Sequence, residues 1–81
     1  MILSQAIEDY LKTIYLLSHG GEVTTSAIAL KLKVSAPSVT GMVKKLAEMK
    51  LLRYTRYQGV ELTAAGEKIA LEVIRHHRLL E

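Results

Sequence analysis

Two side chains near the end of the 81-residue chain could bind one metal ion together. His77 and Glu81 are four residues apart, so a helix would carry this imidazole and this carboxylate on the same face. Such ligands suit Mn(II) or Fe(II), and the chain has no cysteine that could supply a softer thiolate ligand. A histidine–glutamate pair at this spacing is more often a solvated surface pair, so the spacing alone leaves both interpretations open.

The middle of the chain concentrates positive charge. From Thr24 to Val60, seven basic residues stand against the single acid Glu48, which gives +6, whereas the remaining residues, four basic and seven acidic, give −3. The seven are Lys31, Lys33, Lys44, Lys45, Lys50, Arg53 and Arg56. A positive segment between acidic flanks is expected of a surface that binds a polyanion. A solvated basic face without a partner would have the same charge, so charge alone does not decide between the two.

A short run of small polar residues lies inside this basic segment, at the start of an apolar helical repeat. The run comprises Ser35, Ala36, Pro37, Ser38 and Thr40. Hydroxyl groups and a helix N-terminus can bind phosphates or base edges, and alanine and proline could contact thymine methyl groups. Gly41 follows without a long side chain that would read a base, so we expect much of any DNA affinity to come from backbone charge and DNA shape.

Other candidate phosphate contacts surround this run. They are Lys44 and Lys45 further along the same helix, Lys31 and Lys33 on the preceding helix, and Arg53, Arg56 and Tyr57 after it. For Tyr54, phosphate contact and packing under a hairpin are equally favoured. Together with the +6 segment, these residues predict a DNA-binding surface rather than a helical pair that only packs.

The elements that must position these residues follow from hydrophobic spacing. Apolar residues at helical intervals predict three helices: one capped by Ser4 and stopped at Gly20–Gly21, one capped by Thr25 or Ser26, and one capped by Ser35. Their predicted inward residues are Ile7, Tyr10, Leu11, Ile14 and Leu17, then Ile28, Ala29 and Leu32, then Val39, Met42, Val43 and Leu46. A short helix, a link of about four residues and a second helix with a polar first turn form a helix-turn-helix pattern.

An alternating segment and a last helix complete the pattern. From about Leu52 to Leu62 the alternation, with a turn at residues 57–59, predicts a two-stranded hairpin. Thr63 then caps a helix whose inward side is predicted to carry Ile69, Val73, His76 and Leu80. The order helix, helix, helix, hairpin, helix predicts a mainly α fold with a small β-hairpin, the winged helix-turn-helix.

Three motifs in this order resemble a known family. The stretches "EDYLKTIYLL", "VSAPSVTGMVKKLAEMKLL" and "LTAAGEKIALEVIRHHRLLE" look like the amino-terminal part of the diphtheria-toxin-repressor family, metal-dependent transcription regulators of bacteria and archaea that include the manganese regulators. The resemblance covers essentially the whole chain. It implies a repressor that binds palindromic double-stranded DNA operators as a homodimer when loaded with Fe(II) or Mn(II). It also implies a DNA-binding domain at residues 1–62 and a helix at 63–81 that leads toward a dimerisation and metal-binding domain absent from this chain.

The resemblance also implies a set of metal ligands. Asp9 occupies the ligand position of the first helix, His77 and Glu81 match the ligand pair of the last helix, and His76 has no ligand role. An aspartate at position 9 favours manganese, whereas Lys12 stands where the manganese regulators place a second carboxylate, which argues against a two-metal cluster. The remaining family ligands would follow Glu81, so we expect metal binding by this chain alone to be weak or absent.

Two alternative functions stay open at this point: a winged helix that binds a protein partner, and a DNA-binding regulator that no metal controls. An enzyme is disfavoured because the chain has no cysteine and no acid–base pair around a nucleophile. The chain also lacks the basic flank and apolar run of a secretory signal, and it has no run of roughly 18 apolar residues that could span a membrane. We therefore expect a cytoplasmic protein.

Overall fold

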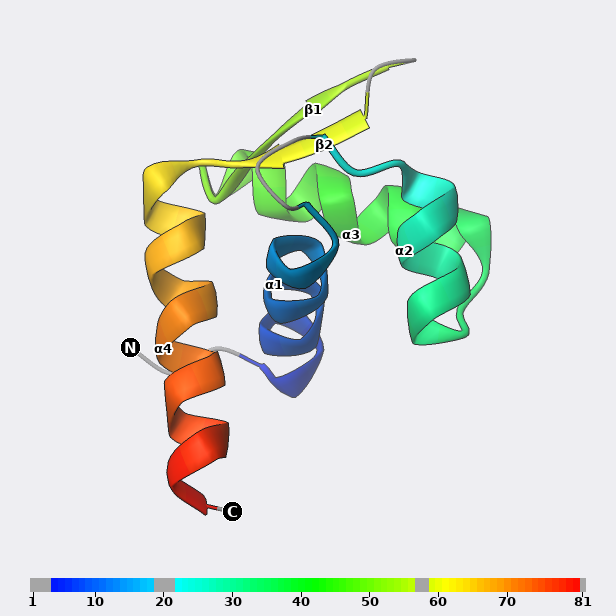
Figure 1. Cartoon of the computed structure of the whole chain (residues 1–81). Helices are drawn as coiled ribbons and strands as arrows, with labels where there is room; N and C mark the ends of the chain where they lie inside the picture. The colour runs from blue at the N-terminus through cyan, green and yellow to red at the C-terminus, as the bar shows by residue number, and fades with distance from the viewer. Residues whose placement is uncertain (1–3, 19–21, 57–58, 81) are drawn as a thin grey trace.

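The computed structural model describes residues 4–18, 22–56 and 59–80, with side chains up to residue 76. Within these residues the chain forms four helices and one antiparallel hairpin, in the order α1 (Gln5–Ser18), α2 (Thr25–Leu32), α3 (Ala36–Glu48), β1 (Leu52–Thr55), β2 (Gly59–Leu62) and α4 (Ala64–Leu80). Helix α1 packs against α2 and α4, and α3 packs against α2 and β1 (Figure 1). The order of elements confirms the predicted winged helix-turn-helix fold.

Hydroxyl side chains determine where the helices begin. Each accepts a hydrogen bond from a backbone N–H in the first turn, which satisfies a group that the helix itself leaves without a partner. The bonds are Ile7 N to Ser4 Oγ at 3.2 Å, Ser38 N to Ser35 Oγ at 3.3 Å and Gly66 N to Thr63 Oγ1 at 3.2 Å. The predicted caps Ser4, Ser35 and Thr63 are confirmed.

The predicted cap of α2 was wrong by one or two residues. Thr24, rather than Thr25 or Ser26, has the extended backbone of a cap, and its Oγ1 accepts a hydrogen bond from the N–H of Ala27 at 3.0 Å. The reason lies outside the local sequence: Val23 pairs with Val60 of β2 through two backbone hydrogen bonds of 2.9 and 2.8 Å. This pairing keeps the chain extended up to Thr24, so the helix begins immediately after it.

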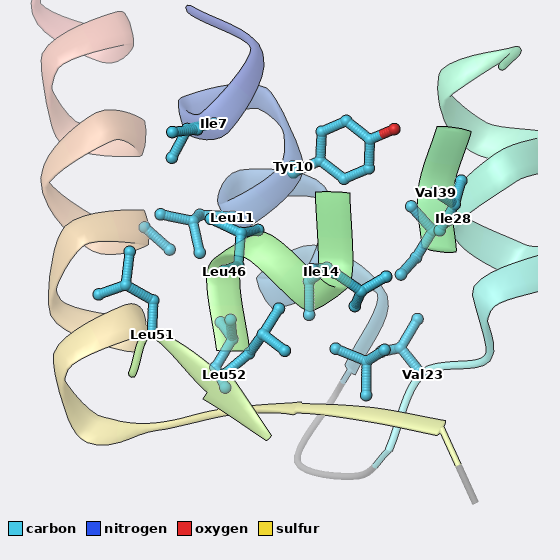
Figure 2. Close-up of a cluster of buried hydrophobic side chains, with 14 residues drawn as sticks. Ile7, Tyr10, Leu11, Ile14, Val23, Ile28, Val39, Leu46, Leu51 and Leu52 are labelled. Atoms are coloured by element: carbon cyan, nitrogen blue, oxygen red, sulfur yellow. The ribbon is translucent and has the colours of Figure 1, made fainter. Parts of the chain in front are cut away.

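The core lies around α1 and contains the apolar stripes predicted for the first three helices (Figure 2). Ile7, Tyr10, Leu11 and Ile14 of α1 are buried, and the helix contacts α4 on one side and α2 on the other. The buried residues of the other elements are Val23, Ile28, Val39, Val43, Leu46, Leu51, Leu52, Val60, Leu62 and Ala70. Helix α3 therefore turns one face into the core, which leaves its opposite face to solvent.

Two glycines allow close contacts at opposite ends of the hairpin. Gly59 has φ +113, and a Cβ on it would lie 2.7 Å from the carbonyl oxygen of Val23. A Cβ on Gly66, in the first turn of α4, would overlap the carbonyl oxygen of Leu51. Both positions therefore require glycine so that the hairpin and α4 can approach their neighbours.

Helix α4 differs from the prediction at one residue. Val73 is buried and Ile69 packs against the core, as predicted, but His76 is exposed rather than turned inward. Ala70 is the last residue of α4 in the core cluster of the described residues, and Val73 is the last buried one; the side chain of Leu80 lies outside the described residues. None of the helices in the described segments is long and apolar enough to cross a membrane.

Candidate nucleic-acid interface

The N-terminal turn of α3 presents the polar run predicted from the sequence. Ser35 has an extended backbone, and Pro37 occupies the first turn, where its missing N–H costs nothing. Ala36, Pro37 and Ser38 are exposed together with Ser35, and Thr40 is half-buried. The start of α3 is therefore a solvent-facing surface of small residues.

The hydroxyl groups of this turn are partly engaged with one another. Ser35 Oγ donates to Ser38 Oγ at 2.8 Å, and Thr40 Oγ1 donates to the carbonyl oxygen of Ala36 at 3.1 Å. The serine pair shares a single hydrogen bond, so one of its two hydroxyl hydrogens is left for an outside acceptor. The turn therefore offers one donor to a phosphate and several acceptors to base amino groups.

The outer face of α3 carries cations next to this turn. Val39, Val43 and Leu46 are buried, whereas Lys44 and Lys45 are exposed on the opposite side. Lysines near the middle of a groove-binding helix can reach phosphates on either side of the groove. Both side chains point away from the core, as predicted, and their phosphate contacts stay a prediction.

The link between α2 and α3 adds two more cations. Lys31 lies in the last turn of α2, and Lys33 ends that helix in a left-handed conformation with φ 58 and ψ 46. The backbone N–H of Lys33 bonds to the carbonyl oxygen of Ala29, which closes the helix and turns the chain toward Ser35. Both side chains are exposed, and α2 packs directly against α3.

The predicted phosphate contacts of the hairpin differ in their surroundings. Arg53 faces Glu61 across the strands, and its Nη2 lies 2.6 Å from Glu61 Oε1. This exposed pair offsets part of the positive charge that the sequence assigned to Arg53. Arg56 is exposed, Tyr54 packs against the core, and Tyr57 lies outside the described residues.

Sequence reasoning missed two features around the hairpin. The Arg53–Glu61 pair depends on the strand register, which places Leu52 opposite Leu62 and therefore residue 53 opposite residue 61. Aligning Leu52 with Leu62 across the turn would have predicted the Arg53–Glu61 pair. The second feature is the left-handed backbone of Lys50, at φ 63, which joins α3 to the hairpin; its exposed side chain is not among the predicted phosphate contacts.

Of the three predicted metal ligands, Asp9 is the one whose side chain lies among the described residues. Its Oδ1 accepts a hydrogen bond of 3.0 Å from Gln5 Nε2, one helical turn earlier. Asp9 also lines an open cavity of about 270 Å³ between α1 and α2, together with Lys12, Lys31 and an apolar floor that includes Leu16 and Leu32. The part of the chain with described side chains contains no cluster of three or more histidine, aspartate or glutamate residues.

The last-helix ligands can be located only by their backbone. His77 belongs to α4, which packs alongside α1, but its side chain and the whole of Glu81 lie outside the described residues. The two helices that carry Asp9 and His77 are therefore neighbours (Figure 1).

Comparison with known proteins extends these observations. Residues 2–60 match the family model described as the iron dependent repressor, N-terminal DNA binding domain. The HTH-type transcriptional regulator MntR of Shouchella clausii (strain KSM-K16) is 46% identical over 77 residues, which are 94% of this chain and 54% of that protein. The chain thus spans about half the length of the curated relatives it matches.

Two solved structures share the fold. The manganese regulator SloR has 42% sequence identity and a TM-score of 0.77, over 93% of this chain and 35% of its own. The protein ZitR of Lactococcus lactis, solved in complex with DNA, has 28% identity and a TM-score of 0.79, over 98% of this chain and 56% of its own.

Proposed function

Because the chain belongs to the iron-dependent repressor family, through its N-terminal DNA-binding domain, we propose that it binds double-stranded DNA as the DNA-binding part of a metal-dependent transcriptional repressor. The family match confirms the resemblance inferred from the sequence motifs. This is a family of transcription regulators, so the proposal is a binding function and not a catalytic one.

One observation carries the proposal: the exposed face of α3 combines a capped, hydroxyl-bearing N-terminus with the two ammonium groups of Lys44 and Lys45. The N-terminus of a helix attracts phosphate through its unpaired N–H groups and its dipole. Small side chains at that end let the helix enter the major groove, and the lysines contact the phosphates beside it. Lys31 and Lys33 extend the positive surface along α2.

Salt dependence tests the DNA proposal. If four exposed lysines of α2 and α3 each contact a phosphate, log K should fall with log salt at a slope of about −3.6, which is about 150-fold between 50 and 200 mM. Lys44→Ala with Lys45→Ala should reduce the slope to about −1.8. Lys68→Ala, which removes an exposed lysine from α4, is the matched control and should leave the slope unchanged.

An absence of duplex binding by the wild-type chain at about 50 mM salt, where phosphate contacts count most, would refute the proposal. Equal slopes for the double variant and the Lys68→Ala control would show that α3 is not the binding surface.

The metal part of the proposal concerns Asp9, His77 and Glu81 as ligands to Mn(II) or Fe(II). The structure of the manganese regulator SloR supports the choice of manganese, and carboxylate and imidazole donors suit these ions. Asp9 fits such a role because the Gln5 amide already holds one carboxylate oxygen, as ligating carboxylates commonly require. Lys12 lines the cavity beside Asp9 and supplies no carboxylate for a second ion, so the three proposed donors fit one ion rather than two.

When bound, the ion would link α1 to α4 through Asp9 and His77. Mn(II) titration followed calorimetrically should detect weak binding that Asp9→Ala and His77→Ala abolish and His76→Ala retains. Identical titrations for all of these variants would remove the metal assignment.

Operator geometry follows from the same proposal. A regulator of this family is proposed to bind a palindromic operator as a homodimer, because a two-fold DNA site matches two copies of one recognition helix. We propose that this DNA binding takes place in the cytoplasm, because the chromosome of a bacterium such as Shouchella clausii lies there.

A further inference from the structure

Gly41 is a glycine that the described fold does not require. Apart from the backbone of its own helix, a Cβ on it would meet no atom within 4 Å, whereas a Cβ on Gly59 or Gly66 would run into a neighbouring carbonyl group. Gly41 lies in the interior of α3 and is exposed. Glycine is the poorest helix former after proline, so helix stability alone would favour alanine at this position. The reason for the glycine must therefore lie outside the folded chain.

The position of Gly41 on the helix indicates what that reason is. At about 100° per residue, Gly41 points away from the buried Val39, Val43 and Leu46, so it lies at the centre of the solvent face. Lys44 is about 60° to one side of it and Lys45 about 40° to the other. Pro37, one turn earlier, lies about 40° from Gly41 on the Lys44 side. The outer face of α3 is thus a smooth strip between two ammonium groups.

The C-terminal end of this strip on α3 carries a negative charge. Glu48, two turns after Gly41, is exposed on the same side of α3 and is the single acid between Thr24 and Val60. Its carboxylate would repel DNA phosphates at the C-terminal end of the helix. The N-terminal half of α3 is therefore the half that can approach DNA most closely.

We propose that Gly41 is the point of closest approach between α3 and the base edges of duplex DNA. The inference rests on the proposed DNA binding and adds a residue to it. Without a side chain at this position, the helix backbone reaches the bases while Lys44 and Lys45 reach the phosphates on either side. A side chain at position 41 would hold the helix away from the groove and lengthen both lysine contacts.

The test uses the intact chain and a fluorescent duplex that the wild-type protein has selected from a random-sequence library. Gly41→Ala and Gly41→Leu should raise the melting temperature, by about 4–8 °C for alanine, because both are better helix formers. Affinity for the selected duplex should fall stepwise, about threefold for alanine and about tenfold for leucine, which is the scale of one lost base contact. Ala6→Leu adds a similar side chain to an exposed site in the first turn of α1, at the end of that helix away from α3, and should not change the affinity (Figure 1).

The outcomes separate this inference from the proposed function. A wild-type chain that selects and binds no duplex refutes the proposed function, and the inference with it. A wild-type chain that binds while Gly41→Leu binds equally tightly refutes the inference alone. Lower melting temperatures for both variants would also overturn it, because the glycine would then be needed by the fold itself.

Discussion

Replacing Lys33 by glycine should make the chain more stable and its DNA binding weaker at the same time. Lys33 has φ 58 and ψ 46, a left-handed conformation that costs an L side chain roughly 1–2 kcal/mol. Glycine removes this cost, but its greater conformational freedom stabilises the unfolded chain by roughly 0.4–1 kcal/mol. The unfolding free energy should therefore rise by about 0.5–1 kcal/mol. The hydrogen bond from the backbone N–H of residue 33 to Ala29 does not depend on the side chain and should remain.

The same substitution removes an exposed ammonium group from the link between α2 and α3. The loss of one phosphate contact changes the slope of log K against log salt by about 0.9. Between about 50 and about 200 mM salt, the wild-type affinity should therefore fall about 3.5-fold further than that of Lys33→Gly. Urea unfolding measures the stability, and fluorescence anisotropy at several salt concentrations measures the slope.

Lys50→Gly is the matched control for this prediction. Lys50 is also exposed and left-handed, with φ 63, but it lies after α3 and outside the predicted DNA contacts. The control should show the same gain in unfolding free energy with an unchanged salt slope. Equal changes of the slope in both variants, or a lower stability of Lys33→Gly, would contradict the prediction.

Four further substitutions, one of them a control, test the fold and its pH dependence. Ser35→Ala removes the cap of α3 and should lower the unfolding free energy by about 1 kcal/mol, whereas Ser38→Ala, which keeps the cap, should change it far less in the same urea titration. Gly66→Ala should lower it by about 1–3 kcal/mol, because the added Cβ overlaps the Leu51 carbonyl; a normal melting temperature would contradict this. Burial raises the pKa of the Tyr10 phenol, so the stability tied to its neutral form is present below the unfolded pKa of about 10 and is lost as the pH rises through and above that value. Tyr10→Phe should therefore lose less stability than wild type between about pH 9 and about pH 11, and parallel losses would exclude burial of Tyr10 as the cause.

The elements of this chain were predictable where their causes are local. The caps at Ser4, Ser35 and Thr63 each depend on a hydroxyl group and an N–H three residues later, which a reader can find by spacing. The apolar stripes of α1 and α3 likewise follow from a repeat within one element. The basic surface of α2 and α3 was predictable for the same reason, because exposed cations alternate with the buried positions of those helices.

The features that were missed depend on contacts between distant segments. The pairing of Val23 with Val60 moves the start of α2 to Thr24, and the pairing of Arg53 with Glu61 neutralises part of a predicted phosphate contact. Neither follows from propensity, because both need the register of the hairpin against the rest of the fold. The exposure of His76 was missed because the amphipathic pattern of α4 continues past the end of the core.

Two residues of α2 and α3 have backbone positions that a different residue would suit better. Lys33 has a left-handed conformation that favours glycine, and Gly41 occupies a helix interior that favours alanine. Each exchange would stabilise the fold, and each would also remove a charge or add bulk on the side of the molecule proposed to face DNA. Residues that oppose local propensity are expected at functional sites rather than in the scaffold. Both departures lie on one helix-turn-helix unit, and the proposed DNA binding accounts for them, whereas the equally left-handed Lys50 lies outside the predicted DNA contacts and has no such account.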